Sequence, residues 1–490
     1  MKLLSFIMLT TAPACFAQSG NIEVLNSKMN LKSEISLPAG KQYGASRWKK
    51  IWWGEHWRKE WTTPVNFRVF DMDTTAGGVT PIKIGGGHQT KSIRLMGGNG
   101  KEYVIRSIDK TLDLLVPEEF KGSFIHEIVN DQISTAHPYA PMVIANLSAS
   151  IGILHSNPII VFVPDNKRLG EFRSEFANKL YLFEERPSGD GWENTTLTDF
   201  GNKILNTEEL LKKLRSDNHS QVDQNEFLKI RLLDMVINDW DRHEDQWVWV
   251  NHQKGGKPFY RAFARDRDQA FSKTDGINLF LLSRPWALRN LQNIDHRVRD
   301  LIGLNLAATA LDRQFLNGLS ENDWRVNIAS LQTLLSDSII QQSLGIMPDE
   351  IYKLSGDWLN KRLRQRRNDM RRFGLGYYRL LSKEVIIAGT DEKEIFTINK
   401  IDKRSTEISV RVVSKKFPAG EISYRRTFFK KDTKTISLYG LRQEDYFIFT
   451  GGKKNRILTR IIEREPNNFF WIVRPLEASE KDQRSTSKIL

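Results

Sequence analysis

The sequence contains a single cysteine, Cys15, which lies close to the start of the chain. Such a chain cannot build a disulfide framework, a cysteine-based zinc site or a thiolate nucleophile beyond that position. The chain that follows also lacks any run of about 20 apolar residues, the length that a membrane-spanning helix needs. These absences exclude a disulfide-stabilised scaffold and predict a protein that is soluble or bound to a membrane surface.

The basic residues are scattered rather than concentrated. The formal net charge is +14, but the sequence has no long basic run and no Cys/His finger pattern. Nucleic acid is therefore not expected as a partner. The positive balance favours an acidic partner, namely a phosphorylated ligand, an anionic lipid or an anionic polymer.

The chain begins with MKLLSFIMLTTAPACFAQSG, in which Lys2 precedes an apolar stretch and a group of small residues. This order is typical of a secretory signal peptide, and we expect cleavage after Ala17. Lipidation of Cys15 is the alternative. The sequence thus predicts an exported protein of the periplasm or the cell surface.

The composition and periodicity of the sequence change several times along the chain. Alternating strand-like runs and glycine turns lie between residues 75 and 187, long amphipathic helices dominate 188–383, and short alternating strands return after Ser382. This pattern predicts an α+β fold that ends in an all-β module. The expected divisions are a signal peptide (1–17), a lead-in segment (18–74), a sheet-rich part (75–187), a helical part (188–383), a β-rich module (384–465) and a polar tail (466–490).

The lead-in segment contains SRWKKIWWGEHWRKEWTTPV, in which five tryptophans alternate with positive charges. Trp48, Trp52 and Trp53 have roughly helical spacing, so a helix that docks on the rest of the protein is the simpler interpretation. Contact with a membrane surface is the alternative, because amphipathic Trp/Lys segments also suit lipid interfaces.

The strongest chemical signal is DMVINDWDRHEDQWVWV at 234–250, followed by FYRAFARDRDQAF at 259–271. Two strands joined by the turn HQKGGKP form a predicted hairpin, which brings Asp241 and Gln246 near Asp266. Phosphoryl transfer needs one carboxylate to accept the proton of the attacking hydroxyl and another to hold Mg²⁺ or Mn²⁺ against the nucleotide phosphates.

The pattern D-R-H-x-x-[NQ], followed by an Asp at a strand end, resembles the catalytic signature of atypical kinases. These include the phosphoinositide 3/4-kinases, the secretory-pathway casein kinases, HipA and the spore-coat kinase CotH. The resemblance implies that Asp241 is the catalytic base, that Asp266 and Gln246 hold the metal, and that Asp268 is a second metal ligand or a cap. It further implies a two-lobed kinase-like domain that uses ATP with Mg²⁺ or Mn²⁺.

The same resemblance implies roles for the sheet-rich part, where a glycine turn covers the phosphates in kinases and a strand cation pairs with them. The turn would contain Gly86, and Arg106 would stand where kinases have a lysine, with Lys91 as the alternative cation. Glu127 is the candidate helix carboxylate, and Glu185 lies at the expected adenine-binding hinge. The chain lacks G-x-G-x-x-G and D-F-G motifs.

A second resemblance extends over nearly all of residues 45–460. WTTPV at 61–65, GTDEKEIF at 389–396 and SLYGLRQEDYF at 437–447 are similar to segments of uncharacterised exported proteins of Gram-negative bacteria. In some of those proteins this unit accompanies a calcineurin-like phosphoesterase domain or an outer-membrane β-barrel. This chain has no His/Asp two-metal motif of its own, so a hydrolytic function is not expected.

Two functions remain open at this point. The first is ATP-dependent phosphoryl transfer to a protein or envelope substrate outside the cytoplasm. The second is a catalytically inactive pseudokinase scaffold that binds a nucleotide or partner during envelope biogenesis, with peripheral association to the outer membrane. Arg106 in place of lysine and Gln246 in place of asparagine favour the second.

Overall fold

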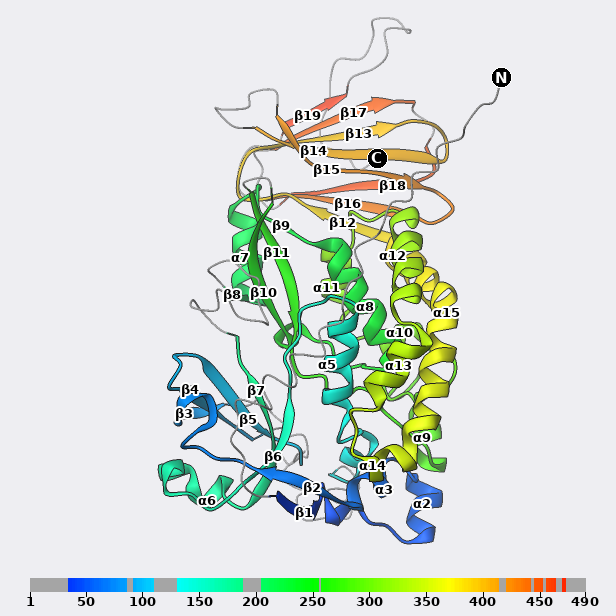
Figure 1. Ribbon diagram of the computed structural model, residues 1–490. Helices are drawn as coiled ribbons and strands as arrows, with labels where there is room; N and C mark the ends of the chain where they lie inside the picture. Colours follow the sequence, from blue (N-terminus) through cyan, green and yellow to red (C-terminus); the bar gives the residue numbers. More distant parts are fainter. Residues whose placement is uncertain are drawn as a thin grey trace, which may run out of the picture.

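The computed structural model describes residues 34–85, 91–109, 130–187, 204–254, 257–413, 420–441, 445–452, 455–463 and 469–472. Figure 1 shows a sheet-rich part at the lower end, a helical part in the middle and a second strand-rich part at the upper end. The expectation of a chain that combines helices with several separate sheets is confirmed.

The lower part is built on a seven-stranded sheet in the order β1-β2-β6-β7-β5-β4-β3. All neighbours pair antiparallel except β2 and β6, which run parallel. The lead-in segment therefore contributes two strands to this sheet. The strands are β1 (Glu34–Pro38), β2 (Pro64–Val69), β3 (Val79–Gly85), β4 (Ser92–Gly97), β5 (Glu102–Ser107), β6 (Ile159–Val163) and β7 (Lys179–Glu185).

The two faces of this sheet are covered by different elements because alternate residues of a strand point to opposite sides. Ile105 and Phe183 lie on one face, in an apolar cluster with Phe176 of α6 (Arg173–Phe176) and Leu169 of η5 (Lys167–Phe172). Leu182 lies on the other face, in the main core with α5 (Ala140–Ser150). Polar residues on this second face of β5 and β7 therefore point toward the helical part.

The lead-in helices are anchored by tryptophans and by a buried ion pair. The indoles of Trp57 and Trp61 donate to the carbonyls of Phe271 and Ala136 at 2.9 Å each. Arg58, which is 1% exposed, pairs with Asp131 through both terminal nitrogens. These contacts hold α3 (Arg58–Thr62), which follows η1 (Lys41–Tyr43) and α2 (Arg47–Trp53), against residues 131–136 and Phe271.

The helical part is organised around α8 (Gln224–Ile237), which is buried along most of its length and packs against α12 (Glu321–Leu334) and α15 (Asp357–Ser382). Local sequence sets several of the helix starts, since Asp223 caps α8 and Ser320 with Asp323 forms a capping box on α12. The remaining helices here are α9 (Ile277–Leu282), α10 (Leu301–Leu304), α11 (Thr309–Phe315), α13 (Asp337–Leu344), α14 (Asp349–Ile351) and the π-helical turn η7 (Tyr352–Gly356).

A long hairpin follows α8. Strands β10 (Trp247–Lys254) and β11 (Lys257–Ala264) pair antiparallel, with β8 (Ile204–Asn206) and β9 (Gln221–Val222) at the two edges of this small sheet. Trp247 and Trp249 are almost fully buried, and Trp249 packs on Phe315 with ring centroids 4.8 Å apart. Helix α7 (Thr207–Ser216) starts at Asn206 with a second capping box.

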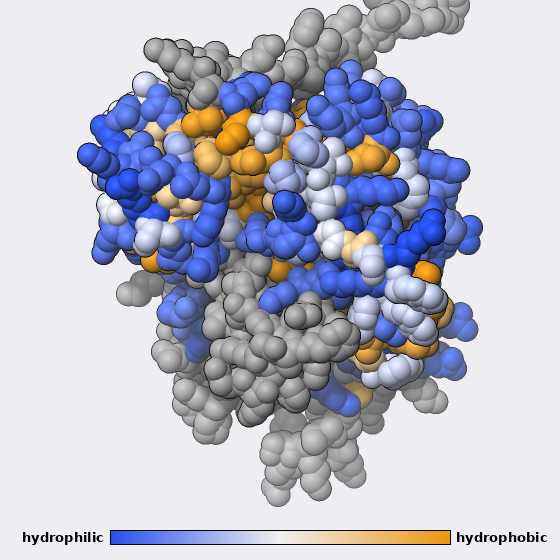
Figure 2. Space-filling model, turned by 90° about the horizontal axis from the view of Figure 1, so that it is seen from below, coloured by the Kyte–Doolittle hydropathy of each residue, from blue (hydrophilic) through white to orange (hydrophobic). Residues whose placement is uncertain are grey.

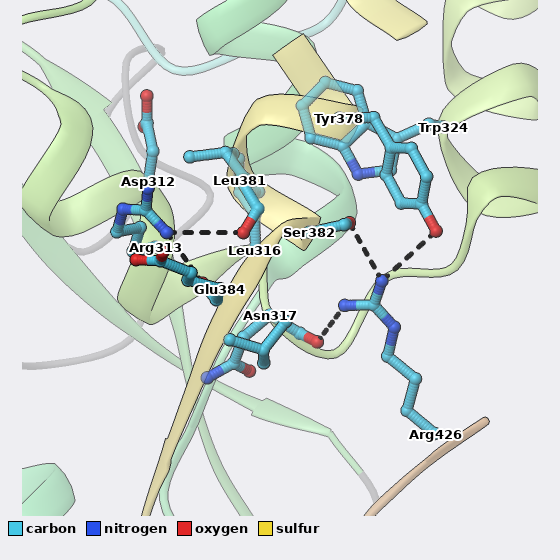
Figure 3. A pocket seen from close by; sticks show the side chains of 11 residues that line it. Asp312, Arg313, Leu316, Asn317, Trp324, Tyr378, Leu381, Ser382, Glu384 and Arg426 are labelled. Atoms are coloured by element: carbon cyan, nitrogen blue, oxygen red, sulfur yellow. Dashed lines mark hydrogen bonds between the residues drawn. The ribbon is translucent and has the colours of Figure 1, made fainter. Parts of the chain in front are cut away.

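The upper part contains only strands among its described residues and combines two sheets, ordered β12-β16-β18 and β15-β14-β13-β17-β19. Arg426 of β15 joins it to the helical part, donating to the hydroxyls of Tyr378 and Ser382 and to the carbonyl of Asn317 (Figure 3). The strands are β12 (Glu384–Ala388), β13 (Glu394–Lys400), β14 (Ser405–Val412), β15 (Glu421–Phe429), β16 (Thr435–Gly440), β17 (Tyr446–Gly451), β18 (Leu458–Glu463) and β19 (Phe469–Ile472).

No helix within the described ranges has the length and the apolar composition to cross a lipid bilayer.

Candidate functional site

The site predicted from the sequence lies where the C-terminal end of α8 meets the base of the β10–β11 hairpin. Asn238 ends α8 in the left-handed conformation, with φ of 60°, and the chain turns into the Asp-Trp-Asp-Arg-His loop. Phe271, at the other end of the motif, donates its backbone N–H to the carbonyl of Ile237 at 2.7 Å. The two chemical motifs of the sequence therefore both return to the end of one buried helix.

The hairpin register fixes the position of Asp266. Trp247 opposes Ala264, and the Arg265 N–H donates to the Gln246 carbonyl at 2.8 Å. Asp266 follows this last rung directly and has a φ of 51°, a left-handed conformation that aspartate tolerates better than most residues. Left-handed backbone of this kind gathers at functional sites, where the surrounding structure holds the strain.

Arg242 connects the Asp-Arg-His loop to the end of the hairpin. Its side chain is fully buried, donates to the carbonyl of Arg265 at 2.7 Å and reaches the carbonyl of Asp266 at 3.5 Å. A third bond goes to the carbonyl of Gln246 at 3.3 Å. Arg242 therefore holds the backbone that carries Asp241 and the backbone that carries Asp266 in one rigid unit.

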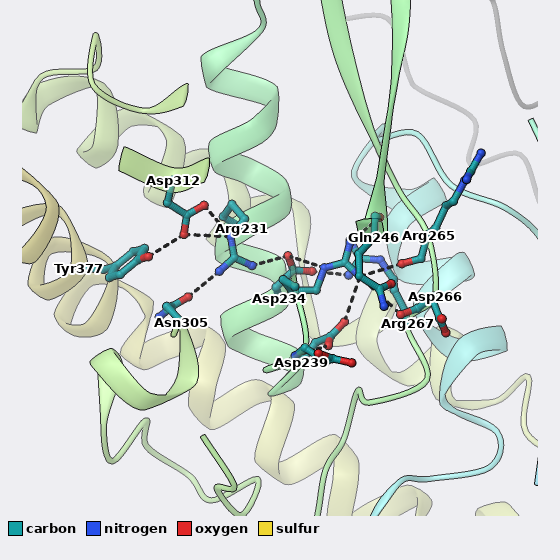
Figure 4. A network of polar contacts seen from close by, with 12 residues as sticks. Arg231, Asp234, Asp239, Gln246, Arg265, Asp266, Arg267, Asn305, Asp312 and Tyr377 are labelled. Carbon is teal, nitrogen blue, oxygen red and sulfur yellow. Dashed lines mark hydrogen bonds and ion pairs between the residues drawn. The ribbon is translucent and has the colours of Figure 1, made fainter. Parts of the chain in front are cut away.

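A buried network of arginines and aspartates packs beside this unit (Figure 4). At its centre, Asp234 of α8 receives Arg231 and Arg267 at 2.6 Å each and lies 3.6 Å from Arg242. Arg231 also pairs with Asp312 at 2.9 Å. Every one of these side chains is at least nine-tenths buried. The network fixes the loop to α8 and, through Arg267, to the segment after the hairpin.

The pKa values of two carboxyl groups in this network are shifted in opposite directions. Burial alone would raise the pKa of Asp234, but Arg267, Arg242 and Arg231 outweigh it and hold that pKa below its usual value. Burial raises the pKa of Asp239 to about 6, although Arg242 opposes the shift. Asp239 is thus the carboxyl group of this loop whose charge changes just below neutral pH.

Arg106 links the seven-stranded sheet to the hairpin. Its guanidinium forms an ion pair with Asp266, and its other terminal nitrogen donates to Glu184 Oε1 at 3.0 Å. Burial disfavours the charged guanidinium, yet Asp266, Glu184 and Asp268 outweigh burial and raise the pKa of Arg106. The sheet and the helical part therefore meet at a permanently charged cation held between carboxylates.

A small hollow surrounds this junction and contains about 290 Å³ of empty space, part of it open to solvent. Its polar lining includes Arg106, Glu184 and Asp266, together with Ser148 of α5 and His155. Within the described structure, the Ser148 hydroxyl, His155 Nε2 and Arg106 Nε are buried without a hydrogen-bond partner. The hollow thus combines a fixed cation with polar groups that can still accept or donate hydrogen bonds.

The predicted site residues are distributed unevenly around the hollow. Asp266 lines the hollow, and the negative charge of Asp268 helps to raise the pKa of Arg106. Asp241 does not belong to the lining; its N–H points to Asp239 Oδ1 at 3.4 Å, and its charge helps to raise the pKa of Asp239.

Gln246 has a different role from the predicted one. In the amide orientation that satisfies its neighbours, its nitrogen donates to the carbonyls of Arg265 at 3.1 Å and Asp266 at 3.2 Å, and its oxygen accepts from His243 Nε2 at 3.3 Å. The side chain is only 7% exposed. Gln246 therefore braces the backbone at Asp266 and presents no oxygen atom to a metal there.

Lys91 does not reach Arg106. It precedes β4 and opposes Ser107 in the sheet, one position beyond the Ser92–Arg106 pair, so strand alternation places it on the other face. Its ammonium pairs with Glu175 of α6 at 2.7 Å. The alternative cation of the sequence prediction is thus excluded by the pleat of the sheet.

The remaining predicted residues lie at or beyond the edge of this site. Glu185 ends β7 opposite Tyr103; burial raises the pKa of that phenol, and the charge of Glu185 adds to the rise. Gly86 and Glu127 lie outside the described residues.

Glu184 belongs to the candidate site, and sequence reasoning missed it. It lies one position before Glu185, 9% exposed, and accepts hydrogen bonds from Arg106 and, at 2.6 Å, from Ser156. Val104 pairs with Glu184 and Leu182 pairs with Arg106, so Glu184 and Arg106 are diagonal neighbours on one face of the sheet. The alternating pattern of KLYLFEE could have revealed this position, because Glu184 lies on the same face of the strand as Leu182.

Within the described part of the chain, no group of three or more His, Cys, Asp or Glu side chains is arranged to hold a metal ion. Asp266 can supply one carboxylate to a divalent cation. Magnesium is usually held by one or two carboxylates together with substrate phosphates, so this donor set fits a metal that arrives with a nucleotide. It does not fit a metal held by protein side chains alone.

Comparisons with known proteins add little to this geometry. No family profile and no curated protein matches the sequence. Among solved structures, a Helicobacter pylori proinflammatory kinase, CtkA, is similar over 61% of this chain and 96% of that chain, with 11% identity and a TM-score of 0.32. A TM-score this low carries no argument about this chain.

Proposed function

We propose that the chain is an atypical kinase-like protein whose site at the junction of the seven-stranded sheet and the helical part transfers a phosphoryl group from ATP. The observation that carries this proposal is the contact of Arg106, on the sheet, with Asp266, at the end of the hairpin. These residues are 160 positions apart in sequence, and phosphoryl transfer needs their two kinds of charge together.

Each residue of the site then has a separate task. Asp266 would hold Mg²⁺ or Mn²⁺, with Asp268 as the second acidic residue, and the metal would supply positive charge against the nucleotide phosphates. Arg106 binds a phosphate through its planar guanidinium. Asp241 accepts the proton of the attacking hydroxyl group. In the exported setting that the sequence predicts, the hydroxyl belongs to a protein or an envelope component.

Loading of a nucleotide requires Arg106 to exchange partners. In the described conformation, one terminal nitrogen of Arg106 engages Asp266 and the other engages Glu184. A metal on Asp266 would compete with the first contact and leave the second intact. Glu184 thus keeps Arg106 in the hollow, while the nitrogen of Arg106 that faces Asp266 turns to bind phosphate.

The second candidate function is an inactive kinase-like scaffold for envelope assembly, which one observation favours. The Gln246 amide is occupied by backbone carbonyls, so the hollow offers fewer oxygen ligands than a two-metal kinase site needs. For such a scaffold, the Arg106–Asp266 pair only stabilises the fold, and the protein works by binding partners at its surface.

A ligand-binding experiment with purified protein separates the two. We expect ATP with Mn²⁺ to raise the melting temperature of the wild type and to have no effect on Asp266→Ala. Asp245→Ala is the matched control, because Asp245 lies in the same loop with its side chain 88% exposed. Absence of a shift in the wild type would refute nucleotide binding.

Catalysis is tested next by autophosphorylation with radiolabelled ATP. We expect incorporation by the wild type and by Asp245→Ala, and loss of about 100-fold or more in Asp241→Ala, as is usual when a general base is removed. A metal-dependent ATP shift with no incorporation in any variant would instead support the scaffold.

A further inference from the structure

The end of the molecule farthest from the strand-rich upper part carries an apolar surface that the proposed function does not use. Helices α2 and α9 pack side by side at this end (Figure 1). Their outward side chains are large: Trp48 is 74% exposed, Phe280 55%, and Trp286, in the turn after α9, 77%. Ile51, Trp52 and Leu281 are also exposed. We call these six residues the α2–α9 surface.

The two segments that carry this surface contain cations and no acids: residues 45–54 contain Arg47, Lys49 and Lys50, and residues 276–292 contain Arg284 and Arg289. Three of these cations pair with acids outside the segments, Lys49 with Asp131, Lys50 with Glu55 and Arg289 with Asp300. Within the described residues, Arg47 and Arg284 form no ion pair, so they are the cations available to an anionic partner. Figure 2, which looks onto this end of the molecule, shows hydrophobic side chains interspersed with hydrophilic ones. Bulky apolar side chains among cations are the composition of segments that lie in the interface of an anionic membrane.

The two helices form a firm platform. Gly54 and Gly276 have φ of 106° and 102°, and a Cβ added at Gly276 would lie 2.4 Å from the backbone nitrogen of Gly54. The His56 N–H donates to Asp275 Oδ1 at 2.8 Å across the same junction. Two separate stretches of sequence are thus held together so that their tryptophans act as one surface.

We propose that the α2–α9 surface binds the headgroup region of an anionic lipid bilayer. Tryptophan favours the polar–apolar boundary of a membrane because its ring is apolar and its N–H is polar. The guanidinium of Arg284 stacks on the Phe280 ring with 3.6 Å to the centroid, which places a cation directly against an apolar contact. Phosphate headgroups would meet these cations while the tryptophans enter the interface. This inference does not depend on phosphoryl transfer.

Vesicle co-sedimentation tests the proposal. We expect the full chain to bind vesicles that contain phosphatidylglycerol, and to bind pure phosphatidylcholine vesicles far more weakly. The double variant Trp48→Ser/Trp286→Ser should lose affinity by about tenfold or more, because both indoles leave the interface. Arg47→Gln should weaken binding to the anionic vesicles only, and added salt should do the same.

The control is a double variant that removes two exposed apolar side chains elsewhere on the molecule. Val326→Ser/Phe429→Ser removes side chains that are 59% and 49% exposed on α12 and β15, and it should bind as the wild type does. Asp266→Ala should also bind normally, which separates this inference from the proposed function. Equal binding by the tryptophan variant would overturn the proposal. Self-association of the wild type without vesicle binding would overturn it too, since it would identify a second copy as the occupant.

Discussion

Asp234 is the side chain whose removal most directly tests whether the buried polar network holds the candidate site. It is fully buried and receives two charge-assisted hydrogen bonds of 2.6 Å, from Arg231 and Arg267. Asp234→Asn preserves the shape but removes the charge, and the new amide group points donors at one of the two guanidinium groups. The network consists of three arginines and three aspartates: Arg231, Arg242, Arg267, Asp234, Asp239 and Asp312. After the substitution, three arginines face only two carboxylates.

The expected cost follows from these contacts. A hydrogen bond to a charged group contributes about 1.5–3 kcal/mol, and two are lost or weakened. Leaving a buried charge without its partner costs about 3–5 kcal/mol, which agrees with that sum. We therefore expect Asp234→Asn to lower the free energy of unfolding by about 3–5 kcal/mol, measured by urea denaturation at pH 7.

Two comparisons make the result specific. Asp369→Asn, at an ion pair with Arg372 on the half-exposed face of α15, should cost less than about 1 kcal/mol. The double variant Asp234→Asn/Arg267→Met removes one charge of each sign, so its loss should be smaller than the sum of the single losses by about 1 kcal/mol or more. A loss below about 1 kcal/mol for Asp234→Asn, or strict additivity in the cycle, would refute the argument.

Other parts of the molecule give further predictions. Burial raises the pKa of Glu394 to about 8 from an ordinary 4.5, so the folded state keeps a proton that the unfolded chain loses. Its stabilising contribution is complete below pH 4.5 and is lost as the pH rises to 8, by up to about 5 kcal/mol. Melting scans should show that Glu394→Gln gains stability over the wild type at pH 8 and not at pH 4.5; equal pH profiles would contradict this. Gly276→Ala should lower stability by about 2 kcal/mol or more in denaturation, because its Cβ meets the Gly54 backbone. Gly100→Ala, also at positive φ but with open space around the Cβ, should cost less, and equal losses would contradict the steric reasoning. Arg426→Met should lower the melting temperature, since three hydrogen bonds that join the upper part to the helices are lost, and an unchanged value would contradict this role.

The sequence already contained the local chemistry of the candidate site. The hairpin was predictable because alternating strands flank a Gly/Lys turn, and its register places Asp266 after the last rung. Arg106 was named from the sequence as a candidate strand cation, and the structure places it against Asp266. Its role in binding phosphate stays a prediction. These features depend on short-range patterns and on one hairpin, so periodicity and spacing suffice.

Two residues that the sequence named as candidates, Lys91 and Gln246, have other partners in the structure, and residue spacing alone does not reveal those partners. Lys91 lies directly before β4, the strand next to that of Arg106, and only the pairing register shows that the two side chains lie on opposite faces. Gln246 matched the spacing of a metal ligand, but the tertiary fold turned its amide to the carbonyls of Arg265 and Asp266. A buried side-chain amide needs a polar partner, and a backbone carbonyl can meet that need without a metal. The spacing of residues along the sequence does not show which partner lies nearby.

By itself the sequence determined the order of elements, the positions of the acidic motifs and the excess of positive charge. Only the tertiary structure decided which acids face Arg106, that Glu184 is one of them, and that α2 and α9 join into one surface. The physical reason is that local pattern fixes which side of a strand or helix a residue occupies, whereas the partner on that side comes from chain segments far away in sequence. For Arg106 and Asp266 that separation is 160 residues, and the contact exists only because the sheet packs against the helical part.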